Sequence, residues 1–252
     1  MVCNIYEKWC VPFSFLCYTK HSVDLKGETN NMERRNAWKI YTADQLKELD
    51  QINSRYKVCL DEGKTERECV RLTVKEIEKK GYRNLKDIKD SLKAGDKVYA
   101  VCMGKSIAMF QIGKEPLENG MNILGAHIDS PRIDVKQNPL YENEDLAYLD
   151  THYYGGIKKY QWVTLPLAMH GVIAKKDGSV VTINIGEKPE DPVFGVSDLL
   201  IHLSADQLEK KAAKVIEGEA LDILVGSMPL EAKTEEEKKT KELVQANVLK
   251  IL

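Results

Sequence analysis

The sequence lacks several features that would restrict its class at once. No apolar stretch approaches the roughly 18 residues that a membrane-spanning helix needs, so we expect no membrane partner. Neither sign of charge dominates, because 37 lysines and arginines are balanced by 39 aspartates and glutamates, giving a formal net charge of −2. The charges are interspersed and form no basic stripe. This composition argues against nucleic acid as a partner and is typical of a soluble globular protein.

The six cysteines contain no C-x-x-C pair and have no spacing typical of a zinc finger or a disulfide framework. A chain of 252 residues is long enough to bury a core without cross-links. We therefore expect reduced thiols and a cytoplasmic location. No glycine-rich phosphate-binding loop follows any predicted strand, which argues against a small-molecule-binding α/β protein.

Residues 1–31 differ from the rest of the chain, because a short aromatic run is followed by a polar stretch. A signal peptide does not fit well: Glu7 lies in its expected basic region, Pro12 interrupts the apolar run, and no small-x-small cleavage site follows. We interpret residues 1–31 as an unstructured leader or a mis-assigned start ahead of Met32.

From Met32 onward the patterns become regular. Thr42 and Thr65 each begin a capping-box sequence followed by apolar residues at helical spacing, which predicts two helices that end before Gly63 and Gly81. Three strands are predicted next, at 97–103, 106–113 and 122–129. Because the last strand is almost wholly apolar, the pattern indicates an α/β sheet covered on both faces.

After Pro131 the sequence becomes richer in β-formers. The turn sequence Lys175–Gly178 joins two such stretches and predicts a hairpin. The predicted elements of this region are strands at 161–174 and 179–185, a helical turn at 198–203, and a last helix that begins at Thr234. A capping box at Ser204–Gln207 predicts a further helix from Ser204 to Gly218.

His127 lies near the end of the predicted strand 122–129, and Asp129 follows it by two residues. Residues i and i+2 of a strand share a face, so the imidazole and the carboxylate would point the same way. A neutral imidazole is a good zinc ligand, and a nearby carboxylate fixes its tautomer and orientation. The alternative is a strand-end histidine hydrogen-bonded to a local turn.

Several segments, taken in order, resemble the aspartyl-aminopeptidase family of zinc metallopeptidases in its bacterial form. The similarity runs from about Ala37 to Leu252. The matching segments are 37–39, 61–68, Gly125-Ala126-His127-Ile128-Asp129-Ser130-Pro131-Arg132, Tyr154-Gly155-Gly156 with 157–162, 198–203, 206–212 and 223–227. Each is short, but their combination in this order is specific.

The resemblance implies a particular organisation. The family has an α/β, mixed-sheet catalytic domain interrupted by a β-rich dimerisation domain, and it assembles into large homo-oligomers. We accordingly expect residues 32–135 to form the N-terminal part of the catalytic domain. Residues 136–252 would form most or all of the inserted dimerisation domain. The change of pattern after Pro131 agrees with this boundary.

The resemblance also implies a site with two divalent metal ions, usually zinc, that hydrolyses peptides and releases their N-terminal amino acids. His127 matches the first metal ligand, and Asp129 matches the catalytic carboxylate that supports it. The family's remaining ligands and its general base come from later motifs, before which this chain ends. The fragment alone is therefore expected to be inactive. The acidic residues Asp134, Glu142, Glu144, Asp145 and Asp150 are interpreted as a solvated polar loop.

Among the other histidines, His202 matches a residue of the inserted domain that contacts substrate in the neighbouring subunit and could stabilise an oxyanion. Without the family, a histidine packed at the edge of a short helix is the simpler interpretation. His170 and His152 are interpreted as structural. The sequence therefore favours a zinc metallo-aminopeptidase that acts on peptides, and the alternative is a non-catalytic oligomerisation fragment.

Overall fold

The computed structural model describes residues 2–4, 36–231, 234 and 242–251. The chain divides into two compact units, residues 7–62 and residues 1–6 with 63–252. The smaller unit contains a short 3-10 turn, η1 (Ala37–Lys39), and the helix α1 (Ala43–Glu62). The predicted capping box of this helix is confirmed, because Gln45 N–H donates to Thr42 Oγ1 and Thr42 N–H donates to Gln45 Oε1.

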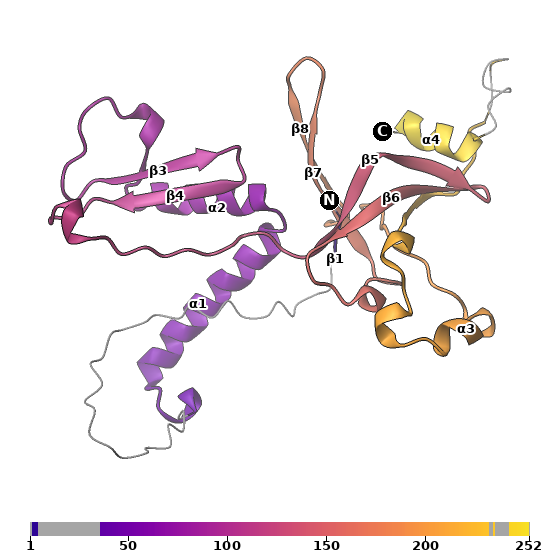
Figure 1. Cartoon of the computed structure of the whole chain (residues 1–252), viewed down its shortest axis with the longest axis horizontal. Helices are drawn as coiled ribbons and strands as arrows, with labels where there is room; N and C mark the ends of the chain where they lie inside the picture. The colour runs from indigo at the N-terminus through magenta and orange to yellow at the C-terminus, as the bar shows by residue number, and fades with distance from the viewer. Residues whose placement is uncertain (1, 5–35, 232–233, 235–241, 252) are drawn as a thin grey trace. The chain divides into compact units, whose positions relative to one another are not determined.

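In the larger unit, α2 (Glu66–Glu78) begins with the second predicted capping box, formed by Thr65 and Glu68. It lies along a three-stranded sheet (Figure 1) whose order is β2 (Arg83–Asn84), β3 (Lys97–Cys102) and β4 (Ser106–Gln111). The strands predicted at 97–103 and 106–113 are confirmed as β3 and β4, and the turn between them places both Met103 and Gly104 at positive φ. The 3-10 turns η2 (Leu85–Asp87) and η3 (Leu117–Asn119) flank this hairpin.

A six-stranded sheet forms the other part of this unit, in the order β8-β7-β1-β5-β6-β9. The strands are β1 (Val2–Asn4), β5 (Arg132–Asn143), β6 (Leu146–Tyr154), β7 (Leu167–Ala174), β8 (Val180–Ile185) and β9 (Ile223–Gly226). The remaining helical elements are η4 (Lys159–Gln161), η5 (Ile201–Leu203), α3 (Ala205–Leu208), η6 (Ala212–Lys214), η7 (Gly218–Ala220) and α4 (Leu243–Ile251).

One apolar core supports the six-stranded sheet. Ile133 of β5 and Leu149 of β6 pack with residues of the loops that follow the strands. Its buried members are Ile133, Leu149, Trp162, Val163, Leu167, Val196, Ile216, Leu221 and Ile223. The hairpin predicted at Lys175–Gly178 is confirmed as the β7–β8 connection, and Gly178 has a φ of +85° there. The strand expected to begin at residue 161 begins at Leu167.

The predicted strand 122–129 does not form. Residues 121–131 have no regular secondary structure, and Leu124 is 90% exposed. A strand needs a neighbour to satisfy its backbone groups, and within the described part of the chain none pairs with this segment. The segment is apolar, as the sequence shows, but apolar character alone does not make a strand without a neighbouring strand to pair with.

The acidic segment 134–150 is not a polar loop, which corrects the interpretation made from the sequence. It is the long β5–β6 hairpin, and Glu144 and Asp145 occupy its turn at φ values of 50° and 58°. Buried residues alternate with more exposed ones along β6, so that Ala147 and Leu149 point into the core, as Ile133 of β5 does. The frequent carboxylates mask this pattern in the sequence.

The helix predicted from Ser204 to Gly218 is limited to the single turn α3, and η6 and η7 follow it. The expected capping box is absent because its side chains bond elsewhere. Ser204 Oγ donates to Ile201 O, and Gln207 Nε2 donates to Asp198 Oδ1. The last helix, α4, has its bounds at Leu243–Ile251, and most of residues 234–242 lie outside the described part of the chain.

For residues 1–31 the sequence predicts an unstructured leader or a mis-assigned start. Of these, the structure describes only Val2–Asn4, which form β1 and pair with β5 and β7, so the prediction differs from the structure for these three residues. The rest of the leader lies outside the described residues. No helix in the described part of the chain is long and apolar enough to cross a membrane.

Candidate metal centre

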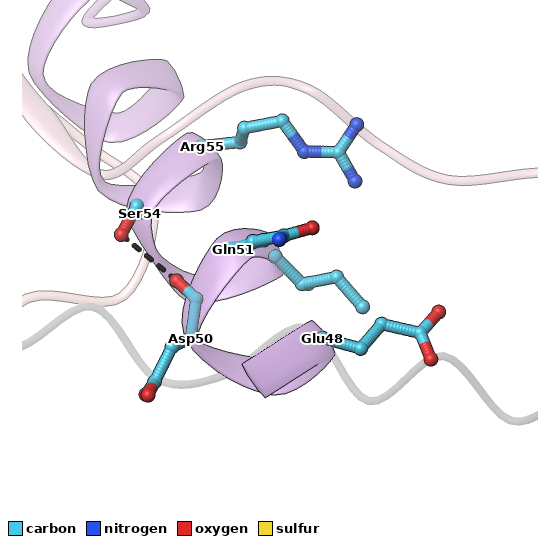
Figure 2. A pocket seen from close by; sticks show the side chains of 6 residues that line it. Glu48, Asp50, Gln51, Ser54 and Arg55 are labelled. Carbon is cyan, nitrogen blue, oxygen red and sulfur yellow. Dashed lines mark hydrogen bonds between the residues drawn. The ribbon is translucent and has the colours of Figure 1, made fainter. Parts of the chain in front are cut away.

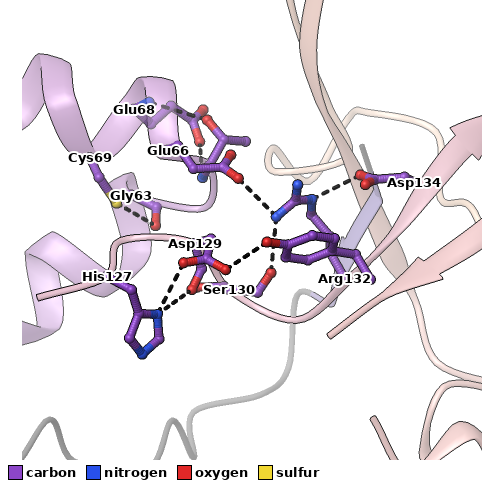
Figure 3. A network of polar contacts seen from close by, with 11 residues as sticks. Gly63, Glu66, Glu68, Cys69, His127, Asp129, Ser130, Arg132 and Asp134 are labelled. Atoms are coloured by element: carbon purple, nitrogen blue, oxygen red, sulfur yellow. Dashed lines mark hydrogen bonds and ion pairs between the residues drawn. The ribbon is translucent and has the colours of Figure 1, made fainter. Parts of the chain in front are cut away.

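His127 and Asp129 lie side by side, as the motif predicts. His127 Nδ1 is 3.1 Å from Asp129 Oδ1 and 3.2 Å from the Asp129 carbonyl oxygen (Figure 3). Both oxygens can only accept a hydrogen bond, so Nδ1 must carry the proton and donate. The lone pair of the neutral ring then lies on Nε2, the atom that would coordinate a metal. The contact arises within an irregular segment and not from a shared strand face.

Tyr154, the last residue of β6, holds the other carboxylate oxygen of Asp129. Its hydroxyl donates to Asp129 Oδ2 across 2.8 Å. This hydrogen bond, more than the one from His127, lowers the pKa of Asp129, and the carboxylate in turn raises the pKa of the Tyr154 hydroxyl. Asp129 is therefore kept ionised as an acceptor for both neighbours.

Arg132 anchors this group to the rest of the fold (Figure 3). Its guanidinium forms ion pairs with Glu66 at 3.1 Å and Asp134 at 2.8 Å, and it donates to the Ser130 carbonyl oxygen. Its Cζ atom lies 4.0 Å from the centroid of the Tyr154 ring, within cation–π range. One buried cation thus connects α2, β5 and β6 to the segment that carries His127.

His202, the residue predicted to contact substrate, is not part of the His127–Asp129 group. It is exposed in η5, and Leu200 before this turn and Leu203 at its end are each 70% exposed. Among the described residues the structure records no contact between His202 and His127 or Asp129. Its role across a subunit boundary therefore stays a prediction.

A zinc ion generally requires about three protein ligands. Within the described residues, no group of three or more histidine, cysteine, aspartate or glutamate side chains could hold a metal. Three of the carboxylates that follow the motif in sequence are engaged elsewhere: Asp134 pairs with Arg132, Asp150 with Lys136, and Glu142 accepts from Gln245 N–H. The described residues suit one metal ligand, His127, and do not complete a metal site.

His170, interpreted from the sequence as structural, lies at the centre of a buried polar cluster. Its side chain is only 3% exposed, with Nδ1 2.9 Å from Glu68 Oε1 and Nε2 2.8 Å from Glu187 Oε1. Burial alone would lower the pKa of His170, but the two carboxylates outweigh it and raise that pKa. His152 packs by stacking on Tyr153, with centroids 5.6 Å apart.

The smaller unit offers no comparable chemistry in its described residues. A surface hollow beside α1 is lined by that helix alone, and Figure 2 shows Glu48, Gln51 and Arg55 projecting to the same side of it. Mixed charges on one exposed helix face are typical of a solvated surface.

Comparison with known proteins identifies the family of the chain. Residues 59–252 match the family model described as aminopeptidase I zinc metalloprotease (M18). The chain belongs to the M18 family. The resemblance found in the motifs is thereby confirmed, and zinc is the metal named in the description of the M18 family.

Two bacterial relatives show how much of an M18 chain is present. A probable M18 family aminopeptidase 1 from Clostridium acetobutylicum is 60% identical over 223 residues, which cover 87% of this chain and 47% of the relative. One from Thermotoga maritima is 43% identical over 225 residues, covering 88% of this chain and 46% of the relative. The chain spans about half the length of these M18 proteins and corresponds to their N-terminal portion.

Solved M18 structures confirm the α/β fold. The crystal structure of the T. maritima M18 aminopeptidase matches with a TM-score of 0.78 at 42% identity, over 87% of this chain and 46% of that one. Aminopeptidase I from C. acetobutylicum matches with a TM-score of 0.73 at 58% identity, over 86% and 47%. The mixed arrangement of small sheets and helices is therefore that of the N-terminal part of an M18 aminopeptidase.

Sequence reasoning identified His127 and Asp129 but missed Tyr154 and Arg132 as their neighbours. Both residues lie within segments that match the family: Arg132 ends the segment 125–132, and Tyr154 begins the segment 154–162. Their meeting depends on the β5–β6 register, in which Arg132 is directly opposite Tyr154. That register spans a hairpin that the sequence analysis did not predict.

Proposed function

We propose that this chain is the N-terminal portion of a metal-dependent aminopeptidase that releases N-terminal amino acids from peptides at a two-zinc site. The observation that carries the proposal is the bond from His127 Nδ1 to Asp129, which orients the ring as a metal-ligating histidine requires. His127 is the metal ligand in this proposal, and Asp129 fixes its tautomer.

Zinc in such a site polarises the peptide carbonyl and provides a hydroxide near neutral pH. The remaining ligands and the general base would come from the half of the M18 chain that the matches do not cover. His202 would contact the substrate bound in a neighbouring subunit, and residues 136–252 would hold the homo-oligomer together. We place the protein in the cytoplasm on the basis of its cysteine usage.

The alternative is a non-catalytic oligomerisation fragment. It is favoured by one observation, namely that the described residues hold no group of three metal-ligating side chains. The two proposals differ in whether the chain becomes active when the rest of an M18 sequence is supplied.

A chimera tests this directly. The chain is fused to the part of the C. acetobutylicum relative that its match does not cover, and zinc content and hydrolysis of aminoacyl p-nitroanilides are measured. We expect bound zinc and turnover in the chimera, loss of both in its His127→Ala variant, and neither in the 252-residue chain alone. A folded chimera without zinc would favour the oligomerisation fragment. Enzyme-like turnover by the chain alone would show that its own residues complete the site.

A further inference from the structure

The segment that carries His127 has no hydrogen-bonded strand on either side, so its backbone does not fix the direction of the imidazole. The His127 side chain is 70% exposed, and that of Asp129 is 36% exposed. Neither side chain is held by packing in a core. A ligand needs a defined orientation to bind a metal tightly, so other contacts must supply it.

Side-chain contacts form a chain that reaches the rigid part of the fold. Glu66 of α2 and Asp134 of β5 hold the Arg132 guanidinium, whose side chain is 10% exposed. The guanidinium lies over the Tyr154 ring, and the Tyr154 hydroxyl donates to Asp129. Asp129 in turn accepts from His127 Nδ1.

The backbone holds Tyr154 close to Asp129. The register pairs Arg132, the first residue of β5, with Tyr154, the last residue of β6. Gly155 follows at a φ of +79°, and a Cβ built on it would lie 3.5 Å from Pro131. The turn after Tyr154 is therefore packed directly against the end of the His127 segment, which keeps the hydroxyl close to Asp129.

We propose that Tyr154 is a positioning residue for the metal ligand His127: its hydroxyl orients Asp129, and Asp129 sets the tautomer and direction of the imidazole. Tyr154 belongs to the strand pair that opens the inserted domain, so this domain would contribute to the metal centre of its own subunit. The effect of Tyr154 on zinc binding rests on the proposed function. Its effect on the His127 tautomer can be measured in the 252-residue chain alone.

The first experiment is nitrogen-15 NMR of the imidazole rings in the 252-residue chain, recorded at a pH where the rings are neutral. The His127 signal is assigned by its loss in His127→Ala. The variant Tyr154→Phe removes the hydroxyl and keeps the ring over Arg132. We expect the unaltered chain to hold His127 with the proton on Nδ1, and both Tyr154→Phe and Asp129→Asn to move the population toward Nε2–H.

Tyr148→Phe is the matched control, because Tyr148 is in the same strand and stacks on Tyr141 instead. It should leave the His127 signal unchanged. The proposal is overturned if Tyr154→Phe leaves the tautomer as it was, or if Tyr148→Phe shifts it equally. Thermal unfolding by circular dichroism confirms that each variant is folded.

The second experiment measures zinc affinity in the chimera by competition with a chromogenic chelator. Loss of a residue that supports a metal ligand typically weakens binding 10- to 100-fold, and we expect about tenfold for Tyr154→Phe. An unchanged affinity beside a shifted tautomer would overturn the metal-positioning role. Absence of zinc from the unsubstituted chimera would instead overturn the proposed function, while the NMR result would still decide whether Tyr154 orients His127.

Discussion

His170 and Glu68 are 102 positions apart in sequence and only 2.9 Å apart in the structure, between Nδ1 and Oε1. Their bond joins β7 to the first turn of α2. Glu68 has a second role, because its other oxygen, Oε2, accepts the Thr65 N–H of the capping box. One buried carboxylate therefore both begins the helix and ties it to the six-stranded sheet.

This pair predicts a pH dependence of stability with two limits. The pKa of His170 is raised, so its contribution is complete below its unfolded value of about 6.5 and is lost as the pH rises through the folded pKa. Burial alone would raise the pKa of Glu68, but His170 and Thr65 lower it overall. The Glu68 contribution is therefore present above about 4.5 and lost as the pH falls through the folded pKa. The pair should stabilise the chain most between these two values.

Glu68→Gln tests the prediction, because glutamine keeps a capping-box acceptor and removes the charge. We expect the free energy of unfolding to fall by about 1.5–3 kcal/mol near pH 6, with a smaller difference at high pH. Urea unfolding at several pH values measures it. Glu76→Gln, on the same helix but in a solvent-exposed pair with Lys79, should change stability much less, because water screens that pair. Equal effects of the two variants would contradict the prediction.

Thr151 provides a test of the core of the β5–β6 hairpin. The residue is fully buried, and its hydroxyl donates to the Leu221 carbonyl oxygen across 2.7 Å. Thr151→Val keeps the shape and leaves that carbonyl unsatisfied, so we expect a loss of about 1–3 kcal/mol in unfolding free energy. Thr182→Val, at an exposed position of β8, should stay within about 0.5 kcal/mol. Chemical denaturation of both variants measures these free energies. An unchanged free energy of unfolding in Thr151→Val would contradict the prediction and would mean that water replaces the hydroxyl.

His127 and His202 should fail differently in the chimera. His127→Ala is expected to lose zinc and activity together, because the imidazole is proposed as a direct ligand. His202→Ala should keep its zinc and lose about 10²–10³-fold in kcat, as is typical when an oxyanion donor is removed. Metal analysis beside steady-state kinetics separates the two. Loss of zinc in His202→Ala would exclude the proposed division of roles.

Mixing the two inactive variants gives a further test. If His202 acts on the neighbouring subunit, hybrid particles of His127→Ala and His202→Ala should regain part of the activity, since some sites pair an intact His127 with an intact His202. Activity is measured after dissociation and reassembly, with each pure variant as the control. Hybrids that assemble normally without any recovery would assign His202 to its own subunit or to packing.

The parts of the fold that were predictable depend on local chemistry. The Thr42 and Thr65 capping boxes and the turn at Lys175–Gly178 specify their elements within a few residues, and all three appear as predicted. Ser204 shows the limit of such signals, because its hydroxyl bonds to Ile201 O and leaves the cap unformed. A capping signal holds only while no competing hydrogen bond, even one from a neighbouring turn, engages the same atoms.

The candidate site divides in the same way. The His127–Asp129 contact spans two positions and could be read from the sequence. The contact between Tyr154 and Asp129 spans 25 positions and depends on the register of β5 and β6. The bond between His170 and Glu68 spans even more of the chain. Such pairings follow from how strands and helices pack, which single-sequence patterns do not reveal.

The position of β8 at the edge of the six-stranded sheet has a consequence for handling the protein. Its sequence, Val-Val-Thr-Ile-Asn-Ile from Val180 to Ile185, is β-branched except at Asn184, uncharged and free of proline, and Val180 is 61% exposed. Such a strand can template the addition of further strands and start aggregation. In the adjoining turn Lys175 and Lys176 outnumber Asp177, which leaves a net positive charge beside this edge. Buffers that screen those charges should therefore shorten the time for which concentrated protein stays clear.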